Sequence, residues 1–239
     1  MDPRFVYDSF VQLLAGVPLT LELTAFAFAL GLLLAVLIAL MQVSALGILR
    51  IPAGAYVFAI RGTPLLVQIF LIYYGLGQFR PTLQSLGLWQ FFREAYWCGI
   101  LALSLNSAAY GSEVLRGALQ SVSRREIEAG RACGMSGLLL YRRIILPLAL
   151  RQALPAYGNE LILMVKATSL VSIITMMEVT GIAARLISET YRPVEVFIAA
   201  GTIYLIINFL LTRAVSMLDW WLTPHLRGMP TIAKVEQAK

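Results

Sequence analysis

The sequence predicts an all-α integral membrane protein, a helical bundle with five transmembrane helices. Three observations lead to this fold class. The chain has 239 residues, of which 59% are hydrophobic and only 13% are charged, with a mean hydropathy of +0.77. No Lys or Arg occurs from Phe5 to Leu49. Further long apolar stretches follow, each bounded by Gly, Pro or charged residues. This composition is too apolar for a soluble domain.

The first apolar stretch, 18–43, has 26 residues. As a helix it would measure about 39 Å, enough to cross a hydrocarbon core of about 30 Å. It is too long for the core of a signal peptide, and the N-terminal Met1-Asp2 lacks a basic leader, so we expect a retained span. By the same criteria the other spans are 51–77, 95–122, 152–177 and 194–218.

The distribution of basic residues predicts the orientation. An odd number of spans places the two chain ends on opposite sides of the membrane. With the N-terminus outside, the external segments carry only Arg4, Arg80, Arg93, Arg185 and Arg192. The cytoplasmic segments carry Arg50, Arg61, Arg124, Arg125, Arg131, Arg142, Arg143, Arg151, Arg213, Arg227, Lys234 and Lys239. The positive-inside rule therefore predicts N-out and C-in, with 1–222 as one transmembrane domain and 223–239 as a cytoplasmic tail.

Several functions are disfavoured by what the sequence lacks. It contains no G-x-x-x-x-G-K-[ST] phosphate-binding loop, so we expect no ATP site of that kind in this chain. The single histidine, His225, lies in the tail, and neither Cys98 nor Cys133 has a neighbour at metal-ligand spacing. We therefore expect no enzymatic centre, no metal and no resident cofactor. The net charge of +6 follows from the topology and forms no nucleic-acid-binding stripe.

The segment 123–147 is charged and lies between apolar spans, so we expect a cytoplasmic loop. Ser123 and Glu126 have the spacing of a capping box, which predicts a helix start. Gly134 followed by Ser136 predicts a break before a second helix, which Pro147 should stop or bend. Such a helix-turn-helix could lie in a groove on a soluble partner. Alternatively, a basic loop could sit on anionic lipid headgroups.

Charged residues within the spans need a partner or an aqueous path. Glu22, in the first span, could line a cavity or reach the interface. Glu113 and Arg116 are three residues apart on one helix face. We favour a structural ion pair between them over contact with a substrate.

The fourth span carries Asn159, Glu160 and Lys166. The six-residue separation of Glu160 from Lys166 places them on different helix faces, so each should face another helix or an aqueous path. Lys166 lies about 21 Å from the helix start by helical rise, too deep to reach the interface easily. Thr168 and Ser169 could contribute hydroxyls to such a path, or could bond to backbone carbonyls.

The sequence Arg61-Gly62-Thr63-Pro64 interrupts the second span. Thr63 precedes a proline and is pushed away from α geometry, which predicts a kink. The kink could let the span rock, or it could be a static bend.

The loop motif resembles the ATPase-docking loop of permeases in binding-protein-dependent ABC importers. Its residues are Glu128-Ala129-Gly130, three residues, Gly134, nine residues, then Ile144-x-Leu146-Pro147. The only departure is Gly130, where the family has a second Ala. Because headgroup binding requires no such fixed spacing, we favour docking over the lipid alternative.

Motifs along residues 12–222 resemble the polar amino-acid permease group: Gly16-Val17-Pro18-Leu19-Thr20-Leu21, Arg61-Gly62-Thr63-Pro64-Leu65-Leu66-Val67-Gln68, Glu113-x-x-Arg116-Gly117, and Asn159-Glu160 with Lys166-x-Thr168-Ser169-Leu170. Within that group, the stretches 93–98 and 178–197 are most similar to the M-type subunits of octopine and nopaline permeases. Histidine and lysine/arginine/ornithine permease subunits follow closely.

This resemblance implies a type I ABC importer permease fold in the bacterial inner membrane. It also implies a heterodimer with a second permease subunit, two ATPase subunits that bind ATP and Mg, and a periplasmic solute-binding protein. The substrates would be opines or basic amino acids, moved by alternating access. Glu22 and Glu160 are candidates to face their cationic groups, and Lys166 could face a carboxylate. The alternative is a secondary transporter or channel subunit, although the paired repeats typical of such transporters are not evident.

Overall fold

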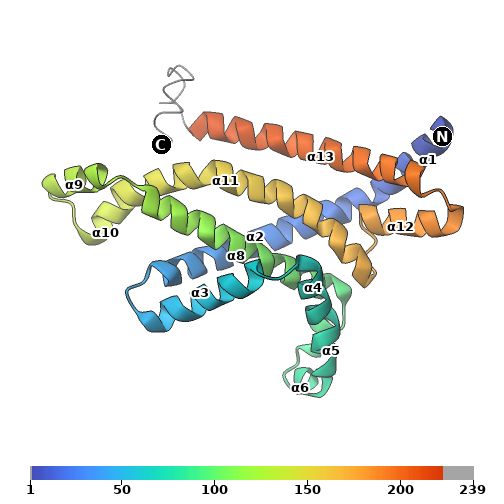
Figure 1. Cartoon of the computed structure of the whole chain (residues 1–239), viewed down its shortest axis with the longest axis horizontal. Coiled ribbons are helices and arrows are strands. Elements are labelled where there is room, and N and C mark those ends of the chain that lie inside the picture. Colours follow the sequence, from blue (N-terminus) through green and yellow to red (C-terminus); the bar gives the residue numbers. More distant parts are fainter. Residues whose placement is uncertain (1, 223–239) are drawn as a thin grey trace.

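The computed structural model describes residues 2–222, and these residues form helices joined by short turns (Figure 1). The α-helices are α1 Pro3–Leu13, α2 Val17–Val43, α3 Gly47–Arg61, α4 Leu65–Phe70, α5 Leu76–Gln78, α6 Arg80–Ser85, α7 Trp89–Phe92, α8 Ala95–Ser121, α9 Arg124–Ala132, α10 Gly137–Leu140, α11 Leu146–Ala167, α12 Val179–Thr190 and α13 Pro193–Leu222. Leu14–Gly16 and Thr168–Ile174 are 3₁₀-helical, and Leu71–Gly75 and Tyr141–Ile145 are π-helical. The predicted all-α class is confirmed. The predicted tail, 223–239, lies outside the described residues.

The long helices α2, α8, α11 and α13 form an elongated bundle (Figure 1). Helices α1 and α12 lie at one end of the bundle, and α9 and α10 lie at the opposite end. In residues 2–222, the helical segments Pro3–Val43, Gly137–Ile174 and Pro193–Trp221 are each long and apolar enough to span a membrane. Helix α8 covers all but the last residue of the predicted span 95–122 but carries too many polar residues to meet that test.

The predicted second span, 51–77, is not one straight helix, because the chain bends by 106° between Gly47–Arg61 and Leu65–Gln78, at the predicted kink. Pro64 has no backbone N–H and takes an extended conformation (φ −62°, ψ 136°), so α3 cannot continue through it. Helices α4, α5 and α6 therefore project sideways from the bundle (Figure 1). We call residues 62–64 the elbow.

The buried side chain of Gln68 holds the elbow in place. Its Nε2 donates to the carbonyl oxygens of Ile60 (2.7 Å) and Thr63 (3.0 Å) and to the Thr63 hydroxyl (2.9 Å). Its Oε1 accepts from Nδ2 of Asn106 at 3.0 Å. These bonds satisfy carbonyls that the broken helix leaves without intrahelical partners.

The helix that contains most of the predicted fourth span, 152–177, begins well before residue 152. A helical stretch runs from Gly137 to Ile174, straight through Pro147, which was expected to stop or bend it. The π-helical turn Tyr141–Ile145 lies immediately before this proline, and Leu146 N–H bonds to the Tyr141 carbonyl across it. Proline is tolerated here because it is the second residue of α11, where this change in hydrogen-bond pattern removes the need for its N–H.

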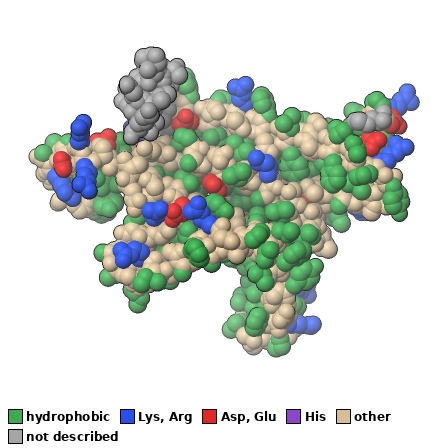
Figure 2. Space-filling view, viewed as in Figure 1, with side chains coloured by type: hydrophobic (Ala, Val, Ile, Leu, Met, Phe, Trp, Pro, Cys, Tyr) green, Lys and Arg blue, Asp and Glu red, His purple; other side chains and the backbone are tan. Residues whose placement is uncertain are grey.

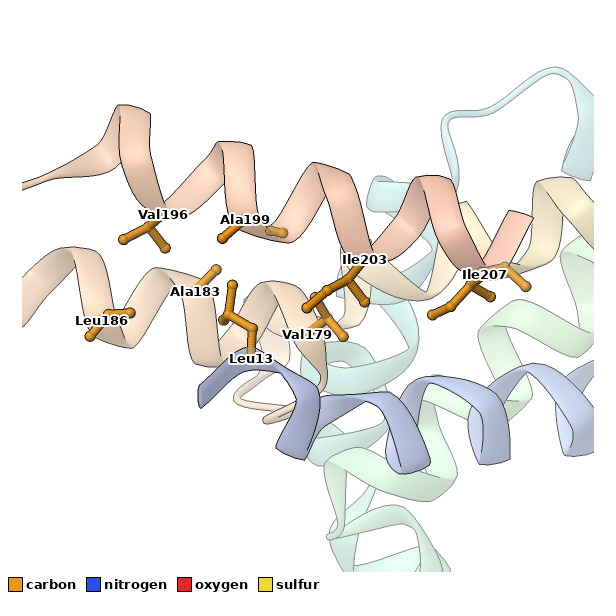
Figure 3. Packing of buried hydrophobic residues seen from close by; sticks show 10 residues of the cluster. Leu13, Val179, Ala183, Leu186, Val196, Ala199, Ile203 and Ile207 are labelled. Atoms are coloured by element: carbon orange, nitrogen blue, oxygen red, sulfur yellow. The ribbon is translucent and has the colours of Figure 1, made fainter. Parts of the chain in front are cut away.

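Buried apolar residues join α1, α12 and α13 at the end of the bundle that carries α1 (Figure 3). Leu13, Val179 and Val196 are fully buried there, and Ala183 and Ala199 let the helices approach closely. This cluster holds α12, which lies between two candidate spans, against the bundle.

Glu178 caps α12 and is fully buried. Its carboxylate accepts from the amides of Thr180 (2.9 Å) and Gly181 (2.8 Å) and from the hydroxyl of Tyr204 (2.7 Å). Burial raises the pKa of this carboxyl above its ordinary value, although hydrogen bonds from Thr180, Tyr204 and Gly181 oppose the shift. The folded protein therefore binds this proton more tightly than the unfolded chain does.

Because the folded-state pKa of Glu178 is raised, its contribution to stability is full below the unfolded pKa and declines as the pH rises through the folded pKa. We expect Glu178→Gln, which cannot titrate, to remove this decline. Melting temperatures of the intact protein and the variant, measured from about pH 5 to about pH 8, check this. The intact protein should lose stability relative to the variant toward the upper end, and parallel curves would contradict the prediction.

Candidate translocation cavity and docking hairpin

A cavity of about 510 Å³ lies where the elbow meets α8 and α11. It is lined by Arg61, Gly62, Thr63, Pro64, Leu65, Leu103, Asn106, Ser107, Tyr110, Glu160, Leu163, Met164 and Ala167. The volume suits a small-molecule ligand. The predicted kink and the predicted path residue Glu160 thus share one cavity, which we call the elbow cavity.

A second cavity, of about 560 Å³, lies beside the first and also contacts Arg61, Gly62 and Tyr110. It includes an ionic cluster formed by Arg61, Gln42, Glu113 and Arg116. In Figure 2, acidic and basic side chains gather in the area where α2, α3 and α8 meet. Arg61 contacts both cavities and so lies between them.

Glu113 is the centre of this cluster. Arg116 donates to both of its oxygens (3.1 and 2.7 Å), as the three-residue spacing predicts, and Nε2 of Gln42 donates to it at 2.7 Å. Arg61 Nη1 lies 3.6 Å from the same carboxylate, and its guanidinium lies 5.2 Å from the centroid of the Tyr110 ring. The cluster joins three helices of the bundle.

Other predicted path residues lie elsewhere. Glu22 is exposed and accepts a 2.5 Å hydrogen bond from the Tyr96 hydroxyl. Asn159 and Lys166 are exposed and do not line the elbow cavity, and within residues 2–222 the Lys166 ammonium forms no ion pair.

The hydroxyls of Thr168 and Ser169 each donate to the carbonyl three residues earlier, at 2.7 and 2.6 Å. In this conformation they satisfy backbone carbonyls, which was the second of the two predicted possibilities.

Sequence reasoning missed Asn106, Ser107 and Tyr110. Tyr110 lies four residues after Asn106 and three after Ser107, and Glu113 follows three residues later, so these side chains lie along one side of α8. A polar stripe of this kind in a long helix could have revealed the cavity wall, because polar residues in a membrane helix tend to face the bundle interior.

The hairpin of α9 and α10 lies at the end of the bundle away from α1 and contains the predicted docking motif (Figure 1). Ser123 and Glu126 form the predicted capping box, with Glu126 N–H donating to Ser123 Oγ at 3.3 Å. Gly134 has φ +80°, which ends α9 as predicted. We call residues 123–147 the docking hairpin.

Gly130 is buried inside this hairpin, while Glu128 and Ala129 are exposed. A Cβ on Gly130 would lie 2.7 Å from Leu140 Cδ1 and 3.3 Å from Ile144 Cγ1. The glycine therefore lets α9 pack closely on the following helix. Leu146 is exposed and Pro147 is partly buried. Gly130 and Ile144 thus face the interior of the hairpin, and Glu128 and Ala129 face outward.

A helical membrane bundle with a cavity that contains charged and polar side chains, and with a basic hairpin at one end, has the architecture of a transport permease. Residues 8–223 match the family described as binding-protein-dependent transport system inner membrane component, and the chain belongs to this family. It is therefore a multi-pass inner-membrane permease of an ABC transporter. It is not itself an ATPase, and ATP is bound by the ATPase partner.

The chain is similar to curated relatives over nearly its whole length. It is 58% identical to the octopine transport system permease protein OccM of Rhizobium meliloti, covering 95% of this chain and 92% of OccM. It is 56% identical to the nopaline transport system permease protein NocM of Agrobacterium fabrum, covering 95% of each. It is 42% identical to the histidine/lysine/arginine/ornithine transport system permease protein HisM of Salmonella typhimurium, covering 82% of this chain and 83% of HisM.

Solved structures support the same fold. A crystal structure of an amino acid ABC transporter with histidines superimposes with a TM-score of 0.82 at 35% identity, covering 92% of this chain and 98% of that one. An inward-facing MetNI methionine ABC transporter has a TM-score of 0.70 at 21% identity, which supports the fold alone.

Proposed function

We propose that this chain is one of two similar permease subunits in an importer of opines or basic amino acids, and that a periplasmic binding protein delivers the substrate. The relatives named for octopine, nopaline and histidine/lysine/arginine/ornithine transport support this substrate class. The observation that carries the proposal is the elbow cavity, because it combines an Arg and a Glu that can pair with both charged ends of such a molecule.

In our proposal residues 1–222 form one transmembrane domain that crosses the membrane five times, with the N-terminus outside. Helix α2, the bent pair of α3 and α4, helix α8, the stretch through α11, and helix α13 would be the five crossings. The excess of Arg at the docking hairpin supports a cytoplasmic location for this end. The arrangement of α1 and the hairpin at opposite ends of the bundle is compatible with it (Figure 1).

We assign ATPase docking to Glu128, Ala129, Gly130, Gly134, Ile144, Leu146 and Pro147. The exposed Glu128 and Ala129 would contact the ATPase, and the buried Gly130 would keep the hairpin compact. When the two ATPase subunits close, the docking hairpins would be drawn together. The spans would then rock about the elbow and open the cavity toward the binding protein.

The substrate path would include the elbow and Glu160, with the second permease subunit completing the wall of the cavity. Glu22, Asn159, Lys166, Thr168 and Ser169 stay path candidates through contacts with that subunit or in another conformation. The ion pair of Glu113 and Arg116 would hold α8 in place. A non-helical elbow within the membrane needs a protein or aqueous environment, which supports a dimeric arrangement.

The test is substrate-stimulated ATP hydrolysis by the complete complex in lipid nanodiscs, with its binding protein and octopine, nopaline, arginine or histidine. We expect at least one of these substrates to stimulate hydrolysis in the intact complex. Glu128→Ala should reduce the stimulation by on the order of tenfold, because it removes a contact to the ATPase. Glu94→Ala, outside the proposed docking and path residues, is the control. Lack of stimulation by all four would contradict the substrate class, and unchanged coupling in Glu128→Ala would contradict the role of Glu128.

A further inference from the structure

Resting on the proposed function, we propose that Arg61 is the residue that binds the substrate carboxylate, while Glu160 binds the cationic group at the other side of the elbow cavity. This inference changes the expected role of Lys166, which was the sequence-based candidate for a carboxylate. Arg61 and Glu160 line the same cavity, whereas Lys166 does not line it.

The guanidinium of Arg61 has donors available for a ligand. In residues 2–222 it makes no hydrogen bond and is held only by the 3.6 Å ion pair with Glu113 and by the Tyr110 ring. A guanidinium has five N–H donors in a planar fork that matches a carboxylate. Its side chain is 44% exposed, so an incoming molecule can reach it.

Glu113 does not depend on Arg61 for its hydrogen bonds. It accepts two from Arg116 and one from Gln42, all between 2.7 and 3.1 Å. If Arg61 turned toward a carboxylate in the elbow cavity, Glu113 would keep these three bonds. Glu113 thus holds Arg61 at the edge of the cavity in the substrate-free chain without competing strongly for it.

The opposite side of the site is anionic. Glu160 is partly buried, and within the described chain its carboxylate accepts no hydrogen bond from another side chain or from the backbone. Arg61 is close enough to interact with it electrostatically. A molecule with a carboxylate and a cationic group could therefore pair with both Arg61 and Glu160, whose charges the chain leaves incompletely paired.

Asn106 adds a neutral acceptor to the same cavity. Gln68 Nε2 donates to three oxygens, so its Oε1 must accept, and Asn106 uses its Nδ2 to donate to it. This leaves the Asn106 carbonyl oxygen as an acceptor on the cavity wall. It suits the N–H groups of an ammonium or guanidinium.

The test compares arginine with agmatine, its decarboxylated analogue, in equilibrium binding to the permease–ATPase complex in nanodiscs. The binding protein is omitted because it would impose its own selectivity. Octopine, which carries a further carboxylate, is the third radiolabelled probe. The variants are Arg61→Gln, Arg61→Lys and Glu160→Gln, with Arg50→Gln as a matched control on the same helix but outside both cavities.

We expect Arg61→Gln to weaken binding of arginine and octopine by about tenfold to a hundredfold, as for loss of one charge-assisted pair, and to leave agmatine unchanged. Glu160→Gln should weaken all three probes. Arg61→Lys keeps the charge but loses the planar fork of donors, so it should weaken binding of arginine and octopine less, and again leave agmatine unchanged. This variant replaces Arg61→Gln in the test if the Arg61→Gln complex fails to assemble.

If both Arg61 variants lost equal affinity for arginine and agmatine, the role of Arg61 would be structural and the inference would be overturned. Unchanged binding of every probe, or no saturable binding to the intact complex, would overturn it too. The proposed function is judged separately, by substrate-stimulated ATP hydrolysis with the binding protein present. If substrate still stimulates ATP hydrolysis but one of these contrary binding results is found, the carboxylate site at Arg61 is rejected and the proposed function stands.

Discussion

Replacing Gly181 with alanine is expected to prevent stable folding of the end of the bundle that carries α12. A Cβ at this position would lie 2.0 Å from the backbone oxygen of Met176 and 3.0 Å from its carbonyl carbon. The contact is with backbone, so no side chain can rotate away to relieve it. The amide of Gly181 also donates to the buried carboxylate of Glu178. A shift of α12 would therefore break the network that caps it.

We expect this overpacking to lower the free energy of unfolding by about 3 kcal/mol or more. The effect would show as a low yield and a reduced melting temperature of the purified protein. Gly201→Ala is the matched control, because a Cβ there meets no atom within 4 Å and alanine favours the helix. If the two variants melted at the same temperature, the close approach of α12 to Met176 would not be required for stability.

Replacing Gly130 with valine is expected to uncouple ATP hydrolysis from the substrate. Its Cβ would lie 2.7 Å from Leu140 Cδ1, and the added methyl groups would push α9 away from the helix that follows. Overpacking of this kind costs about 1–3 kcal/mol, and if the hairpin docks on the ATPase as proposed, the displaced hairpin would no longer fit it. We expect basal hydrolysis to persist while the increase on adding substrate and binding protein falls by on the order of tenfold.

A second substitution separates packing from other effects of valine. Leu140→Ala should restore part of the stimulation when combined with Gly130→Val, because it removes the side chain that the valine meets first. Leu140→Ala alone measures the cost of the cavity it creates. Full stimulation in Gly130→Val would show that close packing within the hairpin is unnecessary for coupling, and absence of any rescue would locate the defect outside the contact with Leu140.

The docking hairpin was the part of the molecule that could be predicted most closely. Ser123 and Glu126, and Gly134 at φ +80°, act through bonds and dihedral angles within a few residues, so their spacing is enough to predict the capped helix and the turn. Pro147 was predicted less well. Its effect depended on the π-helical turn before it, which no residue in the sequence marks.

At the elbow, too, local features could be predicted from the sequence and features that depend on distant residues could not. Thr63-Pro64 predicted a break, because the restriction of the residue before proline is local. The 106° angle and its hydrogen bonds depend on Gln68 and on Asn106, which is 38 residues further along the chain. Likewise, Arg61 was predicted as part of a kink, and its position between Glu113 and Glu160 emerged only when α3, α8 and α11 packed together.

The sequence alone determined the class of this protein: its apolar stretches, its predicted docking motif and its family resemblance are patterns of composition and short-range spacing. The tertiary structure decided which charges meet. Placement of Arg61 and Glu160 in one cavity, and of Lys166 outside it, depends on the direction and rotation of separate helices. Those are set by close packing of many side chains, such as Gly130 on Leu140 and Gly181 against Met176, which no local pattern encodes.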